Sequence, residues 1–399
     1  MKRYRVLWCV LLAAILLAMA IATGCSKQEP SIIKIGLLMD VTGPMGPGGI
    51  DMERGARLAF EQAGDIAGKK VELIMEDAAT DAGVALDKTK KLVETNKVAA
   101  IIGPVNGAGD EAVAPYMERV HVPQLDGMGA TRNAVGHDWT FVPLGICEQI
   151  TYAAGIYAHD VLHYNTAVTL GTDFVAGHEF IDGFKMGFEA RGGKVIQQTW
   201  FPMGTTNMIP FMTALKKADV VAFWGVPADV FAFYPQYREL NIKMPVIQPE
   251  DGGVTSSPAM LEKLGKSAVG TVVGSTYLYN TNNPGNKEFV EAYKAKYHQL
   301  PGVMSGCGYA HAQLVIAALK ATNGNVSSDV LYKALKAVSV DTVRGHLSFP
   351  ADQGGFGLVV NYPATMCKIG PNNEIEQIQP TYNAEIHMKD GQFWTTLIQ

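Results

Sequence analysis

The chain has 399 residues, a length that suits two domains better than one. Hydrophobic residues make up 48% of the chain and charged residues 18%, which is the balance of an ordinary soluble globular protein. The formal net charge of −5 leaves no basic excess, so we expect no nucleic-acid partner.

The N-terminal segment has the pattern of a secretion signal. Three basic residues precede an apolar run over residues 7–21, and small residues follow this run. An ordinary signal peptide and a single membrane anchor are both alternatives, although the run is short for the roughly 20 apolar residues that a membrane span needs. No later segment of the sequence is long and apolar enough to cross a bilayer.

Cys25 follows the sequence Ala-Thr-Gly, which resembles a bacterial lipobox. The resemblance implies a signal peptide over residues 1–24, its removal, and acylation of the Cys25 thiol. Residues 25–31 would then be a polar tether. We expect the protein on the periplasmic or cell-surface side, lipid-anchored to the membrane through Cys25. Loss of the three basic residues changes the formal net charge from −5 to about −8.

From residue 32 onward, strand and helix patterns alternate in two series. The first series predicts strands at 32–38, 70–77, 98–103 and 122–126, a loop at 40–49, and helices at 51–64, 84–95 and 108–120. The second predicts strands at 166–170, 194–201, 219–225 and 244–249, and helices at 148–162, 177–192, 208–218 and 229–240. Such alternation predicts an α/β fold with parallel sheets that helices cover on both faces.

The last part of the chain adds elements that must pack back onto these two units. Three helical patterns are expected at 287–297, 310–322 and 328–338. Residues 344–370 alternate like strands, with glycine-rich turns.

The cysteines and histidines do not predict a metal site. Cys9 leaves with the signal, so the mature chain keeps Cys147, Cys307 and Cys367 besides the lipidated one. Their odd number and irregular spacing leave one disulfide open but favour buried free thiols. His159 and His163 have the i, i+4 spacing of helical zinc sites but lack the glutamate of that motif. We expect no metal and no cofactor.

Two other histidines are predicted to have structural roles. His178 and Glu179 are neighbours without a second histidine, so we expect them on a helix surface. His311 stands alone near the start of a helical pattern, and a packing role is expected for it. No nucleophile elbow is present, and no nucleophile stands beside an obvious base, so we expect no catalysis.

Residues 99–112, AAIIGPVNGAGDEA, contain the spacing of a dinucleotide-binding fingerprint, with Asp126 about twenty residues further on. Asp110 and Glu111 argue against that interpretation, because in the first helical turn they would face a pyrophosphate with like charge. An exported protein also meets little dinucleotide. We therefore do not expect a nicotinamide cofactor.

The same segment predicts a carboxylate site. Open α/β sheets bind ligands at the carboxyl ends of their strands, where helix N-termini carry partial positive charge. We expect the amides of Asn106, Gly107 and Ala108 to be free at such a place. The next strand ends near Gly129, Ala130 and Thr131, which offer more amides and one hydroxyl. Two tight turns without a ligand are the alternative.

Several segments in order resemble the type I periplasmic binding proteins of ABC importers, in their leucine/isoleucine/valine-binding branch. These segments are IIKIGLLMDVTGP, DMERGARLAFEQA, VELIMEDAATDAGVALDKTKKLV, AAIIGPVNGAGDEAVAP, VPQLDGMGAT, ARGGKVI, GTTN and RGHLSF. The resemblance covers nearly the whole mature chain. It implies two lobes that close on a small ligand by hinge bending, with three crossovers between them.

Transferred to this chain, the resemblance divides it between the two lobes. Lobe 1 would be residues 32–142 plus 280–349, and lobe 2 would be residues 143–279 plus 350–399.

The resemblance also places a ligand site. Its headgroup pocket falls on two turns of lobe 1, and lobe 2 supplies aromatic walls and an acid. The residues are Val105, Asn106, Gly107, Gly129, Ala130, Thr131, Phe174, Trp224, Glu250 and Asp251. This chain departs from the family at Asn106-Gly107, where a hydroxyl residue is usual, and at Phe174 or Ala176, where a tyrosine is usual. A buried acid is costly unless it is paired, so Glu250 suggests a cationic group on the ligand.

The sequence therefore predicts a lipid-anchored solute receptor of an ABC importer. It would capture a branched-chain or similar apolar amino acid and deliver it to an ABC permease in the membrane. The first alternative keeps the fold but binds an aromatic or other small organic acid, which the aromatic residues and the missing hydroxyls favour. The second is a ligand sensor that signals to a membrane partner.

Overall fold

A computed structural model of the chain describes residues 32–349, 362–389 and 392–398. The predicted signal peptide, the tether and Cys25 lie outside the described residues, as do positions 350–361 of the predicted second lobe. No helix among the described residues has the length and apolar character that a membrane span requires.

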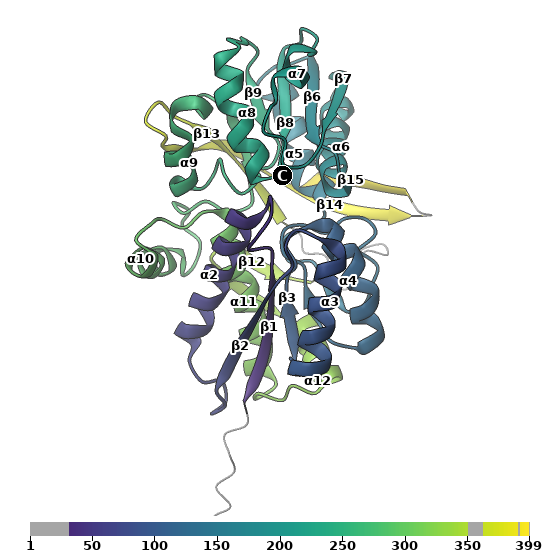
Figure 1. Cartoon of the computed structure of the whole chain (residues 1–399), viewed down its shortest axis with the longest axis vertical. Coiled ribbons are helices and arrows are strands. Elements are labelled where there is room, and N and C mark those ends of the chain that lie inside the picture. Colours follow the sequence, from purple (N-terminus) through teal and green to yellow (C-terminus); the bar gives the residue numbers. More distant parts are fainter. Residues whose placement is uncertain (1–31, 350–361, 390–391, 399) are drawn as a thin grey trace, which may run out of the picture.

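The described chain forms two α/β lobes, stacked one above the other in Figure 1. The sheet of lobe 1 is parallel, and its strand order is β2-β1-β3-β4-β5. The elements up to its last strand are β1 (Ile33–Met39), α2 (Gly46–Ala63), β2 (Val71–Asp77), α3 (Ala82–Lys90), the π-helix η1 (Lys91–Asn96), β3 (Ala100–Ile102), α4 (Gly107–Val120), β4 (Gln124–Leu125) and β5 (Thr140–Phe141).

The sheet of lobe 2 is larger, with the strand order β15-β14-β13-β10-β9-β8-β6-β7. Its parallel part is built from α5 (Cys147–Asp160), β6 (Thr166–Thr172), α6 (Val175–Ala190), β7 (Lys194–Phe201), α7 (Ile209–Thr213), β8 (Val220–Trp224), α8 (Pro227–Glu239), β9 (Val246–Gln248), α9 (Pro258–Leu264), the 3-10 helix η2 (Gly265–Ala268) and β10 (Val272–Ser275). The strands β13 (Tyr362–Ile369), β14 (Ile375–Lys389) and β15 (Gln392–Ile398) extend it in antiparallel fashion.

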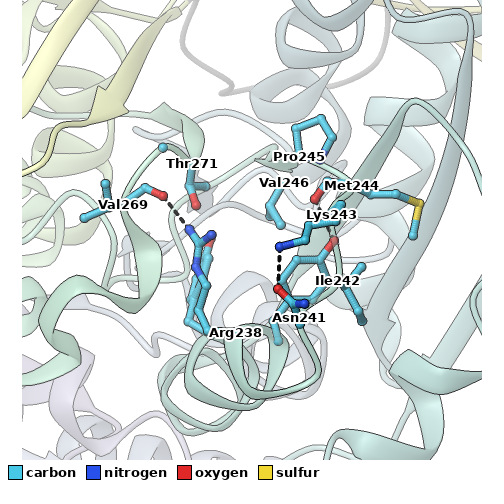
Figure 2. Close-up of a pocket in the computed structure, with 12 residues that line it drawn as sticks. Arg238, Asn241, Ile242, Lys243, Met244, Pro245, Val246, Val269 and Thr271 are labelled. Carbon is cyan, nitrogen blue, oxygen red and sulfur yellow. Dashed lines mark hydrogen bonds between the residues drawn. The ribbon is translucent and has the colours of Figure 1, made fainter.

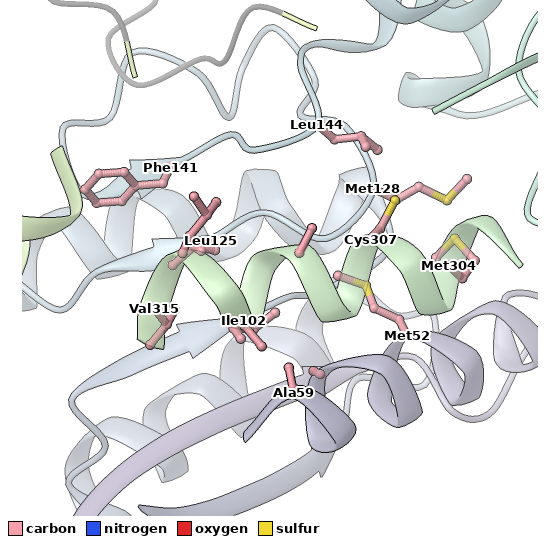
Figure 3. Packing of buried hydrophobic residues seen from close by; sticks show 14 of the residues in the cluster. Met52, Ala59, Ile102, Leu125, Met128, Phe141, Leu144, Met304, Cys307 and Val315 are labelled. Carbon is pink, nitrogen blue, oxygen red and sulfur yellow. The ribbon is translucent and has the colours of Figure 1, made fainter. Parts of the chain in front are cut away.

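The remaining elements pack back onto lobe 1. They are α10 (Asn286–Tyr297), α11 (Val303–Ala321), α12 (Ser328–Lys336) and the hairpin of β11 (Ser339–Thr342) and β12 (Gly345–Ser348). Figure 3 shows α11 beside Met52 and Ala59 of α2 and beside Ile102 and Leu125 of the sheet. The apolar faces of these elements form the core of lobe 1.

The chain passes between the lobes after β5, after β10 and after β12. The third passage includes residues outside the described part. The predicted α/β class, with two lobes and two mostly parallel sheets, is confirmed. The boundaries at residues 142, 279 and 349 stay a prediction.

Two of the differences between predicted and observed elements have a local physical cause. The predicted loop over 40–49 is partly helical, because α2 begins at Gly46 and Pro47 occupies its first turn, where the fixed φ of proline suits a helix. The helix predicted over 208–218 is only the short α7. The side chain of Gln197 bonds the carbonyl of Ala214 at 3.1 Å and the amide of Lys216 at 2.7 Å, and so takes backbone groups that a longer helix would use.

Candidate functional site

The first turn of the predicted site is organised by a buried aspartate. Asp40 follows β1, and its Oδ2 accepts hydrogen bonds from the amides of Val105 (2.8 Å) and Asn106 (3.1 Å). Its Oδ1 accepts from the amide of Thr80 at 2.8 Å and from the side-chain amide of Asn106 at 2.7 Å. Burial raises the pKa of Asp40, and these four hydrogen bonds oppose that rise.

The expectation that the Asn106 amide is free is therefore wrong. The carboxylate of Asp40 occupies that amide, and the Asn106 side chain caps α4 by accepting from the amide of Gly109 at 2.6 Å. The amides of Gly107 and Ala108, in the first turn of α4, have no acceptor within the described part of the chain. They remain the groups at this helix N-terminus that could meet an anion.

The second turn is also bonded internally. The amide of Gly129 donates to Oδ2 of Asp126 at 2.9 Å, and Ala130 forms a parallel bridge with Ile146. The hydroxyl of Thr131 donates to Oε1 of Glu111 at 2.7 Å, so the hydroxyl that we expected to meet a ligand has a protein partner. Gly129 has a φ of +100°, a backbone conformation that favours glycine.

Lobe 2 contributes an aromatic group at the carboxyl end of its sheet. Trp224 ends β8, and its ring lies 4.5 Å from that of Phe180 at an interplanar angle of 22°. Phe174 precedes α6 and lies 5.8 Å from Trp224. Trp224 is 1% exposed and Phe174 is half-buried. Phe180 is the member of this group that sequence reasoning missed, because its helical spacing looks like ordinary core.

Glu250 and Asp251 follow β9 and are both buried, but their roles differ. Oε2 of Glu250 accepts from the indole Nε1 of Trp224 at 2.8 Å and from the amide of Gly252 at 3.0 Å. Asp251 accepts from the hydroxyls of Ser256 (2.5 Å) and Ser275 (2.8 Å) and from the amide of Gly253. Asp251 is thus a loop-organising residue.

The two adjacent carboxyls share one buried environment. Burial raises the pKa of Glu250 well above its ordinary value, and the charge of Asp251 raises it further. Burial raises the pKa of Asp251 as well, but the hydroxyl of Ser256, the amide of Gly253 and the hydroxyl of Ser275 oppose that rise. Of the two carboxyls, Glu250 is therefore the one that holds a proton more readily.

Four predicted site residues, Gly107, Gly129, Trp224 and Glu250, lie along one seam with two residues of α6. We define this seam as Gly107, Gly129, Ala176, Phe180, Trp224 and Glu250. A Cβ built on Gly107 would lie 2.7 Å from Cγ2 of Thr131 and 3.1 Å from Cβ of Ala176 in α6. A Cβ built on Gly129 would lie 3.7 Å from Cζ of Phe180. The glycines therefore allow lobe 1 to approach α6 closely, and the lobes are closed on each other.

An acidic cluster lies beside this seam. Both carboxylate oxygens of Glu179 in α6 accept from the amide of Arg132 at 3.1 Å, and Nε of Arg132 pairs with Glu148 in α5. Burial and neighbouring carboxylates raise the pKa of Glu179 to about 8, and burial raises that of Glu148 to about 7. The prediction that Glu179 lies on a helix surface is wrong. It is 8% exposed, because α6 presents it to the loop after β4.

The predicted packing roles of His311 and of the thiols are confirmed. The ring nitrogens of His311 lie 2.8 Å and 2.5 Å from the carbonyl oxygens of Asp126 and Cys307, and burial lowers its pKa to about 3. Cys147, Cys307 and Cys367 are buried free thiols.

The two sheets meet at a common seam, and helix N-termini, small residues and an aromatic wall lie along it. This arrangement is typical of a two-lobed binding protein for small molecules. A family model described as "Periplasmic binding protein" matches residues 32–357. The chain belongs to the periplasmic binding protein family.

Individual relatives cover most of the chain. The "Leu/Ile/Val-binding protein homolog 7" of Brucella suis is 26% identical over 84% of this chain and 88% of its own length. An ABC transporter substrate-binding protein from Sphaerobacter thermophilus has a TM-score of 0.77 and 28% identity, covering 88% of this chain and 98% of that one. A solute-binding protein of an ABC transporter from Rhodopseudomonas palustris BisB5, in complex with 3,4-dihydroxybenzoic acid, has a TM-score of 0.81 and 25% identity over 88% and 97%.

Proposed function

We propose that the protein is the solute receptor of an ABC importer and captures a branched-chain or similar apolar amino acid between its lobes. Family membership and the printed names of its relatives support the receptor role. The ligand would reach the open lobes, be held as they close, and pass to a membrane permease. A ligand can stabilise the closed state only by the difference between its binding free energies for the closed and the open state.

The observation that carries the amino-acid assignment is the buried Glu250. No cationic side chain of the described residues forms an ion pair with it. A buried carboxylate without a partner is costly, and a ligand ammonium would supply the missing charge. The ligand carboxylate would accept from the amides of Gly107 and Ala108 at the N-terminus of α4.

The ligand side chain would meet an apolar surface. Val105, Phe174 and Trp224 belong to or pack against one hydrophobic cluster that spans both lobes. Such a surface suits a branched aliphatic group, and its burial contributes about 1.5–3 kcal/mol for a side chain of leucine size.

The protein would act outside the cytoplasm. Acylation of Cys25 would hold the receptor at the membrane surface, near its permease, and residues 25–31 would be the tether. Mass spectrometry of the membrane-extracted protein tests this, because replacement of Cys25 by serine should remove both the lipid mass and membrane retention.

A small aromatic acid is the second candidate, and the rings of Phe174, Phe180 and Trp224 favour it. The Rhodopseudomonas relative, whose structure contains 3,4-dihydroxybenzoic acid, supports it too. In that case Glu250 would keep its proton and donate a hydrogen bond to the ligand.

Proton release on binding separates the two candidates. We would titrate the purified protein with leucine and with 3,4-dihydroxybenzoate in two buffers of different ionisation enthalpy. An ammonium ligand ionises Glu250, so leucine should bind with release of a proton, and Glu250→Gln should abolish both binding and release. If only the aromatic acid binds, and Glu250→Gln binds it as well as the wild type, the amino-acid assignment fails.

A further inference from the structure

A hollow of about 240 Å³ lies in lobe 2 at the amino ends of β9 and β10. This hollow and the seam lie at opposite ends of β9. Val246 at the start of β9 lines it, whereas Glu250 follows the end of that strand, roughly 13 Å away at about 3.3 Å per residue. The hollow is therefore separate from the proposed amino-acid site.

Two cationic groups face this hollow (Figure 2). Nε of Arg238 donates to the carbonyl of Ser267 at 2.7 Å, and Nη2 donates to the carbonyl of Val269, so two carbonyls fix the guanidinium. Nζ of Lys243 donates to Oδ1 of Asn241. Figure 2 shows the guanidinium and the ammonium pointing toward the same space from opposite walls.

The hollow lacks a countercharge. Its lining contains these two cations and no carboxylate, and neither cation forms an ion pair with any described residue. A second hollow, which shares Arg238 and Val269, adds Lys266. Both side chains are exposed at the surface, and neutral acceptors hold their charged groups: the carbonyls of Ser267 and Val269 for Arg238, and the side chain of Asn241 for Lys243. An anion in the hollow would therefore meet two positive charges and no negative one.

The rest of the lining is apolar or neutral. Ile242, Pro245 and Val246 form one wall, and Tyr237, whose hydroxyl donates to the carbonyl of Met244 at 2.8 Å, contributes another. A charged floor beside apolar walls suits a ligand with one anionic end and an apolar body.

We propose that this hollow is a second ligand site, which binds a small organic oxyanion through Arg238 and Lys243 and holds its apolar body against Ile242 and Pro245. Arg238 provides a fixed, planar donor, and Lys243 provides a mobile point charge.

Isothermal titration of the purified protein with phenyl phosphate tests this proposal. Phenyl phosphate has both the charge and the apolar body, inorganic phosphate has only the charge, and phenol has only the body. We expect phenyl phosphate to bind one-to-one, inorganic phosphate to bind at least about tenfold more weakly, and phenol not to bind. Binding should weaken with added salt.

Matched variants locate the site. Lys243→Gln, which loses only its bond to Asn241, should weaken phenyl phosphate binding at least about tenfold, because it removes one of the two charged donors to the oxyanion. Arg238→Gln combined with Lys243→Gln should abolish it. The control is Lys216→Gln combined with Lys217→Gln, which removes the same charge from exposed positions elsewhere in lobe 2 and should bind like the wild type.

Three outcomes would overturn the proposal. They are no binding of phenyl phosphate, equal binding by both double variants, and equal affinity for inorganic phosphate.

Discussion

The indole Nε1 of Trp224 donates a 2.8 Å hydrogen bond to Oε2 of Glu250, and both side chains are buried. This bond joins the end of β8 to the loop after β9, where ligands bind in folds of this kind. It holds the Glu250 carboxyl beside the aromatic group of lobe 2.

Trp224→Phe keeps most of the apolar ring but removes the donor. We expect the free energy of unfolding to fall by about 1–3 kcal/mol, because a buried acceptor loses a partner. Urea denaturation of the ligand-free protein measures this. Trp200→Phe is the control, since that ring is half-buried and lies tilted against the ring of His178, with 3.8 Å between the ring centroids. An equal loss in both variants would contradict a special role for the Trp224–Glu250 bond.

Asp40→Asn tests the anchor of the first turn. One carboxylate oxygen is replaced by an NH2 group, which would face amide donors in place of an acceptor. We expect a loss of about 2–3 kcal/mol in the free energy of unfolding. Asp87→Asn, on the exposed face of α3, should change stability by less than about 0.5 kcal/mol. A neutral Asp40→Asn would show that these hydrogen bonds do not position the turn.

The stability of the protein should fall as the pH rises through the range where Glu179 loses its proton. Its folded-state pKa of about 8 lies above the usual glutamate value of about 4.5, so the folded protein keeps a proton that the unfolded chain has released. The stabilisation is complete below about pH 4.5 and is lost as the pH rises through 8. Glu148 and Glu111 face Glu179 with like charge, and Arg132 faces it with opposite charge.

Thermal unfolding of wild type and Glu179→Gln between pH 6 and 9 checks this prediction. Glutamine keeps the shape and an acceptor for the Arg132 amide but does not titrate. The melting temperature of the wild type should fall by several degrees more than that of the variant over this range. Parallel curves for the two proteins would rule out Glu179 as the titrating group.

Gly107→Val should hold the lobes apart. Its side chain would collide with Thr131 and with Ala176 of α6, and overpacking of this kind costs about 1–3 kcal/mol. Since Ala176 belongs to the opposite lobe, we expect the strain to be relieved by opening. Small-angle scattering should then give a larger radius of gyration than for wild type.

The control for that variant is Gly83→Val, at an exposed position in the first turn of α3. It changes the same residue type in a similar helical position but touches no second lobe. An unchanged radius of gyration for Gly107→Val would argue that the seam yields locally and that Gly107 does not control closure.

The α/β architecture of the two lobes could be predicted because the sequence pattern within each segment indicates a strand or a helix. The run at β1, the alternation at β7 and the helical spacing in α6 each depend on neighbouring residues alone. The helix of 208–218 failed because Gln197, on another element, competes for its backbone groups. The helix propensity of residues 208–218 depends only on those residues, so it cannot reveal a competing side chain on another element.

Some features of the candidate site could also be predicted from the sequence, and others could not. The glycine-rich strand ends were visible in the sequence, because turn residues have short-range patterns, whereas Glu250 was singled out by the resemblance to the family. The sequence did not show that Asp40 accepts hydrogen bonds from the amides of Val105 and Asn106, because Asp40 precedes them by 65 and 66 residues. Phe180 and Glu179 looked like ordinary helix positions until α6 was placed against lobe 1.

The sequence by itself determined the α/β class, the order of most strands and helices, and the strand ends where a ligand would bind, since hydrophobic periodicity and turn chemistry act over a few residues. Only the tertiary structure decided which amides remain free, which carboxyls have raised pKa values, and that two cations share a hollow in lobe 2. Those properties depend on burial and on contacts between residues far apart in the chain, where electrostatic energies are set by position in space.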